Sequence, residues 1–204
     1  MNFVFPIEDL FIIIELVAIE VFLVNFSKSK YFSGLISGNL FCFDSDDIWE
    51  KEKLFNQLDF MIKNKYYFTY TNYISFNSET ENNLYEIKPK KYYNFNKFTK
   101  DTSIATSTMM VKKSLIGTTK FSNTKICEDY FFKCQILKKV NYAYCLAENL
   151  MRYRIRKNSL QGNKIRNLYW IWYINKNHNK MNFIKNLLSI FSISFNSMKK
   201  YGFK

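Results

Sequence analysis

Three aspartates within four residues are the most chemically distinctive feature of the sequence. Asp44, Asp46 and Asp47 follow a short apolar run at residues 40–43 and precede Trp49 and a charged segment. This order predicts a strand, an acidic turn and a helix. Carboxylates directly after a buried strand of an open α/β sheet point at the crevice where such sheets bind ligands.

Two interpretations of this DSDD motif remain open. Crowded carboxylates repel one another unless a cation lies among them, and Mg²⁺ or Mn²⁺ take oxygen ligands and often hold a diphosphate. The functional interpretation is therefore a nucleotide-metal site. The structural interpretation is a helix N-cap by Asp46 or Asp47, with the other acids favoured by the helix dipole.

A second acidic pair, Glu128 and Asp129, opens a segment whose apolar residues have helical spacing. We expect a helix over residues 130–139, with its packing face formed by Phe131, Phe132, Ile136 and Leu137. Two acids in a first helical turn are each stabilised by the dipole by about 0.3 to 1 kcal/mol, which is the structural explanation for the pair.

Three arginines occupy every second position at Arg152, Arg154 and Arg156. In an extended segment this spacing places all three side chains on one face. Guanidinium groups pair well with phosphates, and a solvated edge strand is the alternative. Together with the aromatic cluster at residues 169–173, the arginines also leave open a nucleic-acid-binding protein that engages phosphates and stacked bases. That alternative gives the acidic motifs no role.

The elements that position these residues are predicted from hydrophobic spacing. We expect a helix over residues 48–63, with Trp49 packing the helix start onto the sheet, and strands over residues 66–75, 103–111 and 140–146. Residues 77–100 are expected to form a long loop with one helical turn at most. This order favours an α/β fold with a mixed sheet.

The charge is distributed unevenly along the chain. Glu148 is the last acidic residue and 12 of the 30 Lys and Arg follow it, so the other 18 nearly balance the 17 acids. The basic and aromatic last quarter is expected to face an anionic surface or water. With 204 residues, 48% of them hydrophobic, the chain is expected to form one domain with a C-terminal extension.

The cysteines indicate the cellular compartment, and the apolar N-terminal run raises the question of a membrane span or a signal peptide. The four cysteines have no zinc-ligand or CxxC spacing and lie in apolar contexts, which predicts a reducing, cytosolic compartment. Residues 10–26 are apolar, but Glu15 and Glu20 would each cost about 2.5 kcal/mol in a bilayer. A membrane span is therefore not expected, and a signal peptide is not expected because no basic region precedes the run.

Five segments together resemble bacterial family 2 glycosyltransferases of the GT-A fold. They are DSDDIWEKEKLFNQLDFM, FTYTNY, SIATSTMMVKKSLIG, EDYFF and LMRYRIRKNSL, and the resemblance covers residues 34–204. It implies an α/β fold with a GT-A-like mixed sheet flanked by helices, and a basic C-terminal helical extension. It also implies that a sugar moves from a nucleotide-sugar donor to a glycan or lipid-linked acceptor in cell-surface polysaccharide synthesis, with inversion at the anomeric carbon.

The resemblance also assigns roles to individual residues. In the DSDD motif, Asp44 and Asp46 would contact the nucleotide sugar, and Asp46 with Asp47 would hold Mn²⁺ or Mg²⁺. The Glu128–Asp129 pair matches the catalytic acidic motif, in which the aspartate is the general base.

Two further sites follow from the same resemblance. Ser107 and Thr108 match a pair near the acceptor, with a strand of β-branched polar residues as the alternative. Arg154 and Arg156 match an element near the donor diphosphate.

The N-terminal region departs from this family. Residues 1–33 match none of its elements, and the first nucleotide-binding strands are not recognisable. We therefore divide the chain into an atypical apolar segment (1–33), a partial GT-A domain (34–162) and a basic aromatic extension (163–204). One hypothesis is that a shifted reading frame produced the N-terminal segment, which makes an inactive remnant the alternative to a working enzyme.

The expected partners follow from these assignments. They are a nucleotide sugar, a glycan or lipid-linked acceptor and the anionic inner face of a membrane, where the protein would be cytoplasmic and peripheral. Nucleic acid is not expected under this interpretation.

Overall fold

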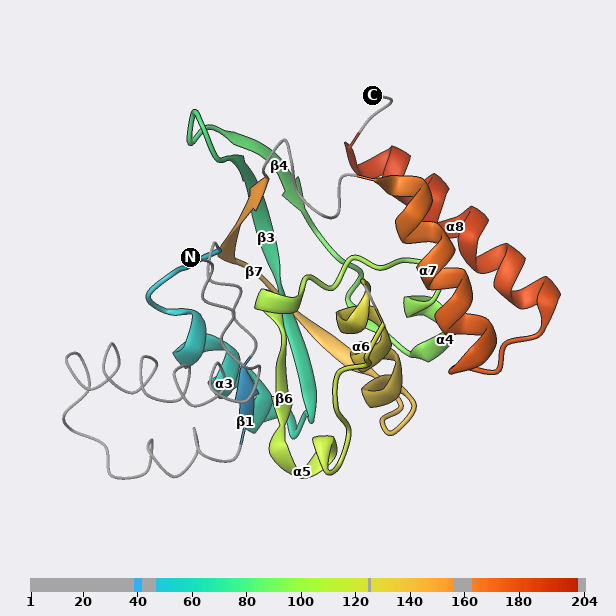
Figure 1. The fold of residues 1–204 in the computed structure, drawn as a ribbon. Helices are drawn as coiled ribbons and strands as arrows, with labels where there is room; N and C mark the ends of the chain where they lie inside the picture. Colours follow the sequence, from blue (N-terminus) through green and yellow to red (C-terminus); the bar gives the residue numbers. More distant parts are fainter. Residues whose placement is uncertain (1–38, 42–46, 125, 156–162, 202–204) are drawn as a thin grey trace, which may run out of the picture.

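A computed structural model describes residues 39–41, 47–124, 126–155 and 163–201 (Figure 1). Asp44, Asp46 and Arg156 lie outside these residues, as do the N-terminal segment and Cys42. The described part is a mixed α/β structure in which helices flank a sheet, as the sequence predicted.

The sheet has seven strands in the order β1-β6-β3-β7-β2, with β4 added to β3 and β5 added to β7. Its strands are β1 (Asn39–Phe41), β2 (Ile48–Trp49), β3 (Phe68–Asn77), β4 (Asn83–Ile87), β5 (Tyr92–Tyr93), β6 (Met110–Lys112) and β7 (Ala143–Ile155). Strands β3 and β7 run parallel from Thr69↔Tyr144 to Asn77↔Ile155, whereas the other described pairs are antiparallel. The sheet is therefore mixed, and β3 and β7 form its centre.

Strand β3 is central because nearly all of its side chains are apolar or small enough to bury on both faces. Phe68, Tyr70 and Phe76 are almost completely buried, and β-branched threonines lie between them. Such a strand reads as a continuous buried run rather than an alternating one. Strand β7 pairs with one edge of β3, and β6 and β4 pair with the other, so β3 is held on both edges and gives the site a rigid support.

The helices are α3 (Lys53–Asn64), α4 (Phe95–Phe98), α5 (Lys113–Ile116), α6 (Glu128–Leu137), α7 (Lys164–Asn177) and α8 (Phe183–Tyr201), with a 3₁₀ turn η1 (Thr106–Thr108). Helices α7 and α8 lie side by side beyond α6 in Figure 1. Ile171, Ile174 and Ile193 join the main hydrophobic core, so the basic C-terminal helices pack against the sheet domain.

Two of the predicted elements contain strands that the sequence analysis did not predict. Ile48 and Trp49 were predicted to be helical but form β2, because they pair with Arg152 and Met151 of β7, and the helix begins only at Lys53. The predicted loop 77–100 contains β4 and β5, although its expected helical turn is present as α4. Tertiary pairing has overridden local spacing in both places.

The predicted strand 103–111 is largely wrong. Only Met110–Lys112 is a strand, and Thr106–Thr108 form the 3₁₀ turn η1. The Thr108 hydroxyl donates to the carbonyl of Ala105 at 2.7 Å, a local side-chain-to-backbone bond of the kind that competes with strand pairing. Strand β7, in contrast, is longer than the predicted 140–146 and includes Arg152 and Arg154.

Candidate functional site

The acidic pair lies in the first turn of α6, where the chain turns sharply. Cys127 precedes the helix in the left-handed region, with φ of 63°, and Glu128 and Asp129 follow it directly. Glu128 is exposed and Asp129 is about one-third exposed. The predicted helix is confirmed, and both carboxylates lie at its N-terminal end, where the helix dipole favours negative charge.

Asp129 is held in place by a buried cation and a hydroxyl. The Lys133 ammonium lies 2.8 Å from Asp129 Oδ2, and the Thr106 hydroxyl donates to the same oxygen at 3.0 Å. Burial alone would raise the pKa of this carboxyl, but Lys133 and Thr106 outweigh burial and lower the pKa below its ordinary value. Asp129 is therefore ionised at neutral pH and can accept a proton.

Lys133 belongs to this candidate site through its contact with Asp129, although the sequence analysis did not single it out. Its ammonium also donates to the carbonyl of Ile104 at 2.9 Å and to Thr106 Oγ1 at 3.1 Å, and its side chain is 4% exposed. Its position four residues after Asp129, one helical turn away, was the available signal.

The turn η1 connects the acidic pair to the segment that follows the DSDD motif. Thr106 binds Asp129 through its side chain, as described above. The backbone carbonyls of the next two residues accept hydrogen bonds from the segment after the DSDD motif. Trp49 Nε1 donates to the carbonyl of Ser107, and Gln57 Nε2 donates to the carbonyl of Thr108, both at 2.9 Å. Residues 49 and 129, eighty positions apart, thus contact consecutive residues of one turn.

Trp49 and its neighbours form a buried polar group beneath this turn. Lys53 is completely buried, its ammonium lies 4.4 Å from the centre of the Trp49 ring, and it donates to Gln57 Oε1 at 2.7 Å. Gln57 in turn donates to Thr69 Oγ1 of β3 at 3.2 Å. Trp49 packs against Leu58 and Met61 of α3 and Met110 of β6, so it joins helix to sheet as predicted, but it belongs to strand β2 and not to the helix start.

Ser107 and Thr108, predicted near the acceptor, are buried in this turn. Their side chains are 1% and 0% exposed. In the described structure their backbone carbonyls hold the turn to Trp49 and Gln57. Contact of either residue with an acceptor remains a prediction.

Asp47 is the member of the DSDD motif that the structure describes. It is 5% exposed, and its Oδ1 accepts the backbone N–H of Arg154 at 3.2 Å. This bond joins the end of the acidic motif to the arginine strand β7. The structure thus brings Asp47 and Arg154 together, whereas Asp44, Asp46 and Arg156 lie outside the described residues.

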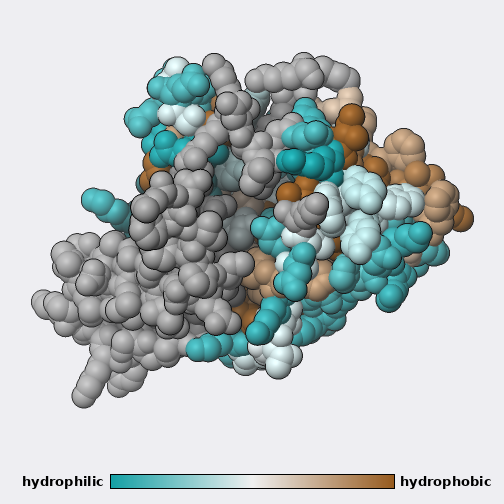
Figure 2. All heavy atoms as spheres, viewed as in Figure 1, coloured by the Kyte–Doolittle hydropathy of each residue, from teal (hydrophilic) through white to brown (hydrophobic). Residues whose placement is uncertain are grey.

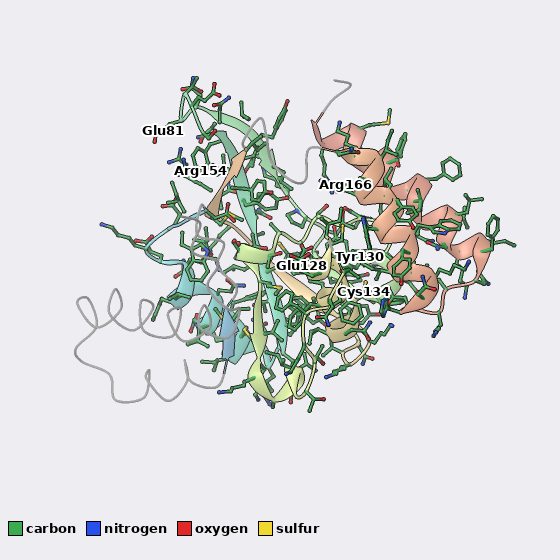
Figure 3. All side chains as sticks on the ribbon, in the orientation of Figure 1. Glu81, Glu128, Tyr130, Cys134, Arg154 and Arg166 are labelled. Carbon is green, nitrogen blue, oxygen red and sulfur yellow. The ribbon has the colours of Figure 1, made fainter. Side chains whose placement is uncertain are left out.

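Arg152 and Arg154 share one face, as their spacing predicted. Their guanidinium carbons lie 4.6 Å and 4.8 Å from the centre of the Phe76 ring. Arg152 also donates to the carbonyl of Glu81 at 3.2 Å, next to the hairpin between β3 and β4. Figure 3 places Arg154 and Glu81 at the same end of the sheet. The arginine face therefore lies at the carboxyl ends of β3 and β7, where open sheets bind ligands.

The carboxylates of the DSDD motif are chemically suitable ligands for a hard divalent cation. Carboxylate oxygens are the ligands that Mn²⁺ and Mg²⁺ prefer. Among residues 39–41, 47–124, 126–155 and 163–201, no group of three His, Cys, Asp or Glu side chains is close enough to hold a metal ion. Asp47 contributes one oriented carboxylate, and the other two aspartates of the motif lie outside these ranges.

The described cysteines and the histidine have structural environments. Cys127, Cys134 and Cys145 are unbridged, and burial raises the pKa of each thiol to about 12, so none is a thiolate at neutral pH. His178 is exposed at the end of α7, where its ring meets Phe131 edge-on. The three described cysteines therefore pack in or against the main hydrophobic core, and His178 lies at the surface.

A separate surface hollow of about 460 Å³ lies at the opposite end of the central strands. It is lined by Lys65, Tyr66, Tyr144 and neighbouring residues. Tyr66 and Tyr144 already stack on each other there, with ring centres 3.7 Å apart. The hollow includes none of the predicted site residues.

No family model matches the chain. Its sequence is nevertheless similar to curated glycosyltransferases. TuaG of Bacillus subtilis, named for teichuronic acid biosynthesis, is 27% identical over 157 residues, which cover 77% of this chain and 62% of TuaG. A glycosyltransferase of Methanocaldococcus jannaschii is 30% identical over 189 residues, 88% of this chain and 61% of that protein.

A third relative is named for a specific reaction. WfgD of Escherichia coli, "UDP-Glc:alpha-D-GlcNAc-diphosphoundecaprenol beta-1,3-glucosyltransferase", is 31% identical over 144 residues, 70% of this chain and 54% of WfgD. The chain thus spans 54% to 62% of the length of these three relatives. It is a distant homologue of bacterial glycosyltransferases, consistent with the family 2 type that its motifs resemble.

Proposed function

We propose that this chain is part of a metal-dependent, inverting GT-A glycosyltransferase. It would transfer a sugar from a nucleotide-sugar donor to a glycan or lipid-linked acceptor in cell-surface polysaccharide synthesis. Two of the relatives support this choice of pathway, since their names specify teichuronic acid biosynthesis and a diphosphoundecaprenol acceptor.

The observation that carries the proposal is the pair of contacts at η1. Thr106 orients Asp129, and the carbonyl of Ser107 accepts from Trp49, which follows the DSDD motif by two residues. A base and a donor-binding motif must be held at fixed separation for transfer, because orientation supplies a large part of such catalysis. A shared turn provides that fixed separation.

In the proposed reaction, Asp129 takes the proton from the acceptor hydroxyl. The acceptor oxygen forms a bond to the anomeric carbon while the bond from that carbon to the diphosphate oxygen breaks, and the nucleoside diphosphate leaves with the bonding electrons. Lys133 and Thr106 keep Asp129 ionised before this step. Arg154, fixed between Phe76 and Asp47, is the proposed contact for the departing phosphates.

Asp46 and Asp47 are the residues that would hold Mn²⁺ or Mg²⁺. A bound cation would supply neutralisation of the negative charge that develops on the diphosphate. Because Asp47 Oδ1 already accepts the Arg154 N–H, its carboxylate would be oriented before any donor arrives.

A binding screen tests the proposal. We would titrate the protein with UDP-glucose, UDP-N-acetylglucosamine and GDP-mannose by calorimetry, with and without Mn²⁺, and measure nucleoside diphosphate release. We expect one donor to bind only with the metal, and Asp46→Ala to weaken that binding. Asp59→Ala, which removes an exposed aspartate of α3 paired with Lys63, is the control and should bind as the parent does.

Two outcomes would contradict the proposal. Failure of every nucleotide sugar in the screen to bind in the presence of Mn²⁺ would indicate an inactive remnant. Salt-sensitive binding of single-stranded nucleic acid, with no response to Mn²⁺ or a nucleotide sugar, would favour the nucleic-acid alternative.

A further inference from the structure

Helix α8 packs on the molecule with its polar side inward. Asn186, Ser189 and Ile193 face the protein and are 1%, 0% and 7% exposed. The opposite side, here called the α8 outer face, consists of Ile184, Leu187, Leu188, Phe191, Phe195 and Met198. All six are exposed, and Phe191 and Phe195 are 66% and 69% exposed. An ordinary surface helix of a globular protein has the reverse arrangement.

Specific hydrogen bonds fix this orientation. Ser189 donates its hydroxyl to the carbonyl of Thr99, and Asn186 donates to the carbonyl of Trp172 at 3.0 Å. Asn196 donates to the carbonyl of Lys100 at 2.9 Å. Rotating α8 to bury its phenylalanines would break all three bonds, so the apolar face points outward as a defined part of the fold.

The charge near this face has one sign. By helical spacing, Lys185 and Lys199 lie along one border of the α8 outer face, and both are exposed. The helix contains no Asp or Glu, and the whole chain after Glu148 has 12 Lys or Arg and no acid. Figure 2 shows hydrophobic and hydrophilic atoms side by side over the region of α7 and α8.

We propose that the α8 outer face docks the protein on an anionic phospholipid surface. The helix lies in the plane of the membrane, its phenylalanines and leucines enter the boundary between head groups and acyl chains, and Lys185 and Lys199 contact the phosphates. Among the residues that the structure describes, no helix has the length and apolar character needed to cross a bilayer.

The charge distribution favours a lipid surface over a second copy of the chain. Two copies meeting through α8 would bring two acid-free basic segments together, and like charges repel at such an interface. Anionic head groups instead complement the cations while the acyl boundary takes up the apolar side chains. The same pairing of Phe and Leu with Lys is typical of helices that lie in a membrane interface.

Flotation of the full chain with vesicles tests the proposal. We would compare vesicles of phosphatidylcholine with vesicles that contain 30% phosphatidylglycerol. We expect binding to the anionic vesicles, a loss of at least tenfold for the double variant F191Q/F195Q, and a loss of about fivefold for each of Lys185→Gln and Lys199→Gln. Because these four side chains are exposed, the variants should fold, which circular dichroism checks.

The matched control is F55Q/I62Q. It removes two exposed apolar residues from α3, which are 44% and 49% exposed, and should bind vesicles like the parent. Equal vesicle binding by F191Q/F195Q and the parent would overturn the proposal, as would equal binding to neutral and anionic vesicles. A dimer in analytical ultracentrifugation that F191Q/F195Q abolishes, without vesicle binding by the parent, would assign the face to self-association instead.

Discussion

The ammonium of Lys133 lies 2.8 Å from Oδ2 of Asp129, one helical turn along α6. Lys133 is buried and also donates to the Ile104 carbonyl, so it cannot move away from the carboxylate without losing a second bond. The proposed base therefore has a fixed positive neighbour that lowers its pKa.

Replacing Lys133 by methionine should move the acidic limb of the pH-rate profile to higher pH. Without the ammonium, burial of Asp129 is opposed mainly by Thr106, so its pKa rises and the carboxylate is protonated at a higher pH. Rates measured from pH 4 to 8 would reveal the shift. Lys138→Met, at the exposed C-cap position directly after the same helix, should leave the limb in place. An unshifted limb in Lys133→Met would separate Lys133 from catalysis.

Asp129→Asn should abolish transfer and leave donor binding nearly intact. Loss of a general base lowers the rate by about 10²- to 10⁴-fold, whereas the donor contacts are assigned to other residues. Single-turnover transfer and calorimetric donor binding, measured side by side, distinguish the two effects. Asp59→Asn is the control on an exposed aspartate. An active Asp129→Asn protein would remove the assignment of the base.

The same variant should also reduce stability. Lys133 would keep its charge without a counterion in a site where it is 4% exposed. Breaking a fully buried pair costs about 3 to 5 kcal/mol, and we expect about 1 to 2 kcal/mol because Asp129 is about one-third exposed. Urea unfolding measures the loss, and a gain in stability would contradict the ion-pair description.

Trp49→Phe tests the link through η1. The variant keeps an aromatic ring beside Lys53 but removes the donor to the Ser107 carbonyl, so we expect a loss of about 1 to 2 kcal/mol in unfolding free energy. Transfer should weaken as well, since η1 also positions Asp129. Trp170→Phe on α7, whose ring meets Tyr169 and Tyr173, is the control and should change stability by less than about 0.5 kcal/mol. Unchanged stability in Trp49→Phe would argue against the link.

Asp101 should make the folded state sensitive to acid. It is 5% exposed; burial raises its pKa, but the Lys200 ammonium at 2.8 Å and the hydroxyls of Ser103 and Tyr93 outweigh burial and lower it. A carboxyl whose pKa is lower in the folded state contributes stability above its unfolded pKa of about 3.9, and this stability is lost as the pH falls through the folded value.

Asp101→Asn is therefore expected to lose stability at neutral pH and to have a weaker dependence of unfolding free energy on pH below about 4. Urea unfolding at pH 3 and pH 7 would compare the two proteins. Glu79→Gln, at an exposed acid of the β3–β4 hairpin, should keep the parent's pH dependence. An acid sensitivity that Asp101→Asn retains in full would have to originate elsewhere.

Strand β3 and helix α6 could be predicted because their own residues favour these structures. FTYTNYISFN is rich in aromatic and β-branched side chains, and EDYFFKCQIL opens with two acids and continues with large apolar residues, so the local sequence favours each element. Trp49 was predicted wrongly because its strand exists only through pairing with Met151, about a hundred residues later. Short edge strands such as β2 have too few residues to show a period.

The sequence singled out some residues of the candidate site but not the contacts between them. Asp129 and Asp47 stand out in sequence, whereas Thr106 has no distinguishing context and acts only because the fold brings it to α6. The predicted strand at 103–111 also concealed η1. A residue that links two motifs by hydrogen bonds can be identified only when the structure shows where both motifs lie.

The ion pair between Asp101 and Lys200 makes the end of α8 part of the folded core. Shortening the chain before residue 200 would leave a carboxylate buried without its nearest cation, and removing α7 and α8 would strip three isoleucines from the central cluster. The two basic helices are therefore an integral part of the folded structure, and we expect their removal to destabilise it. Point variants of their exposed residues can test binding by these helices without changing stability, whereas truncations would alter both.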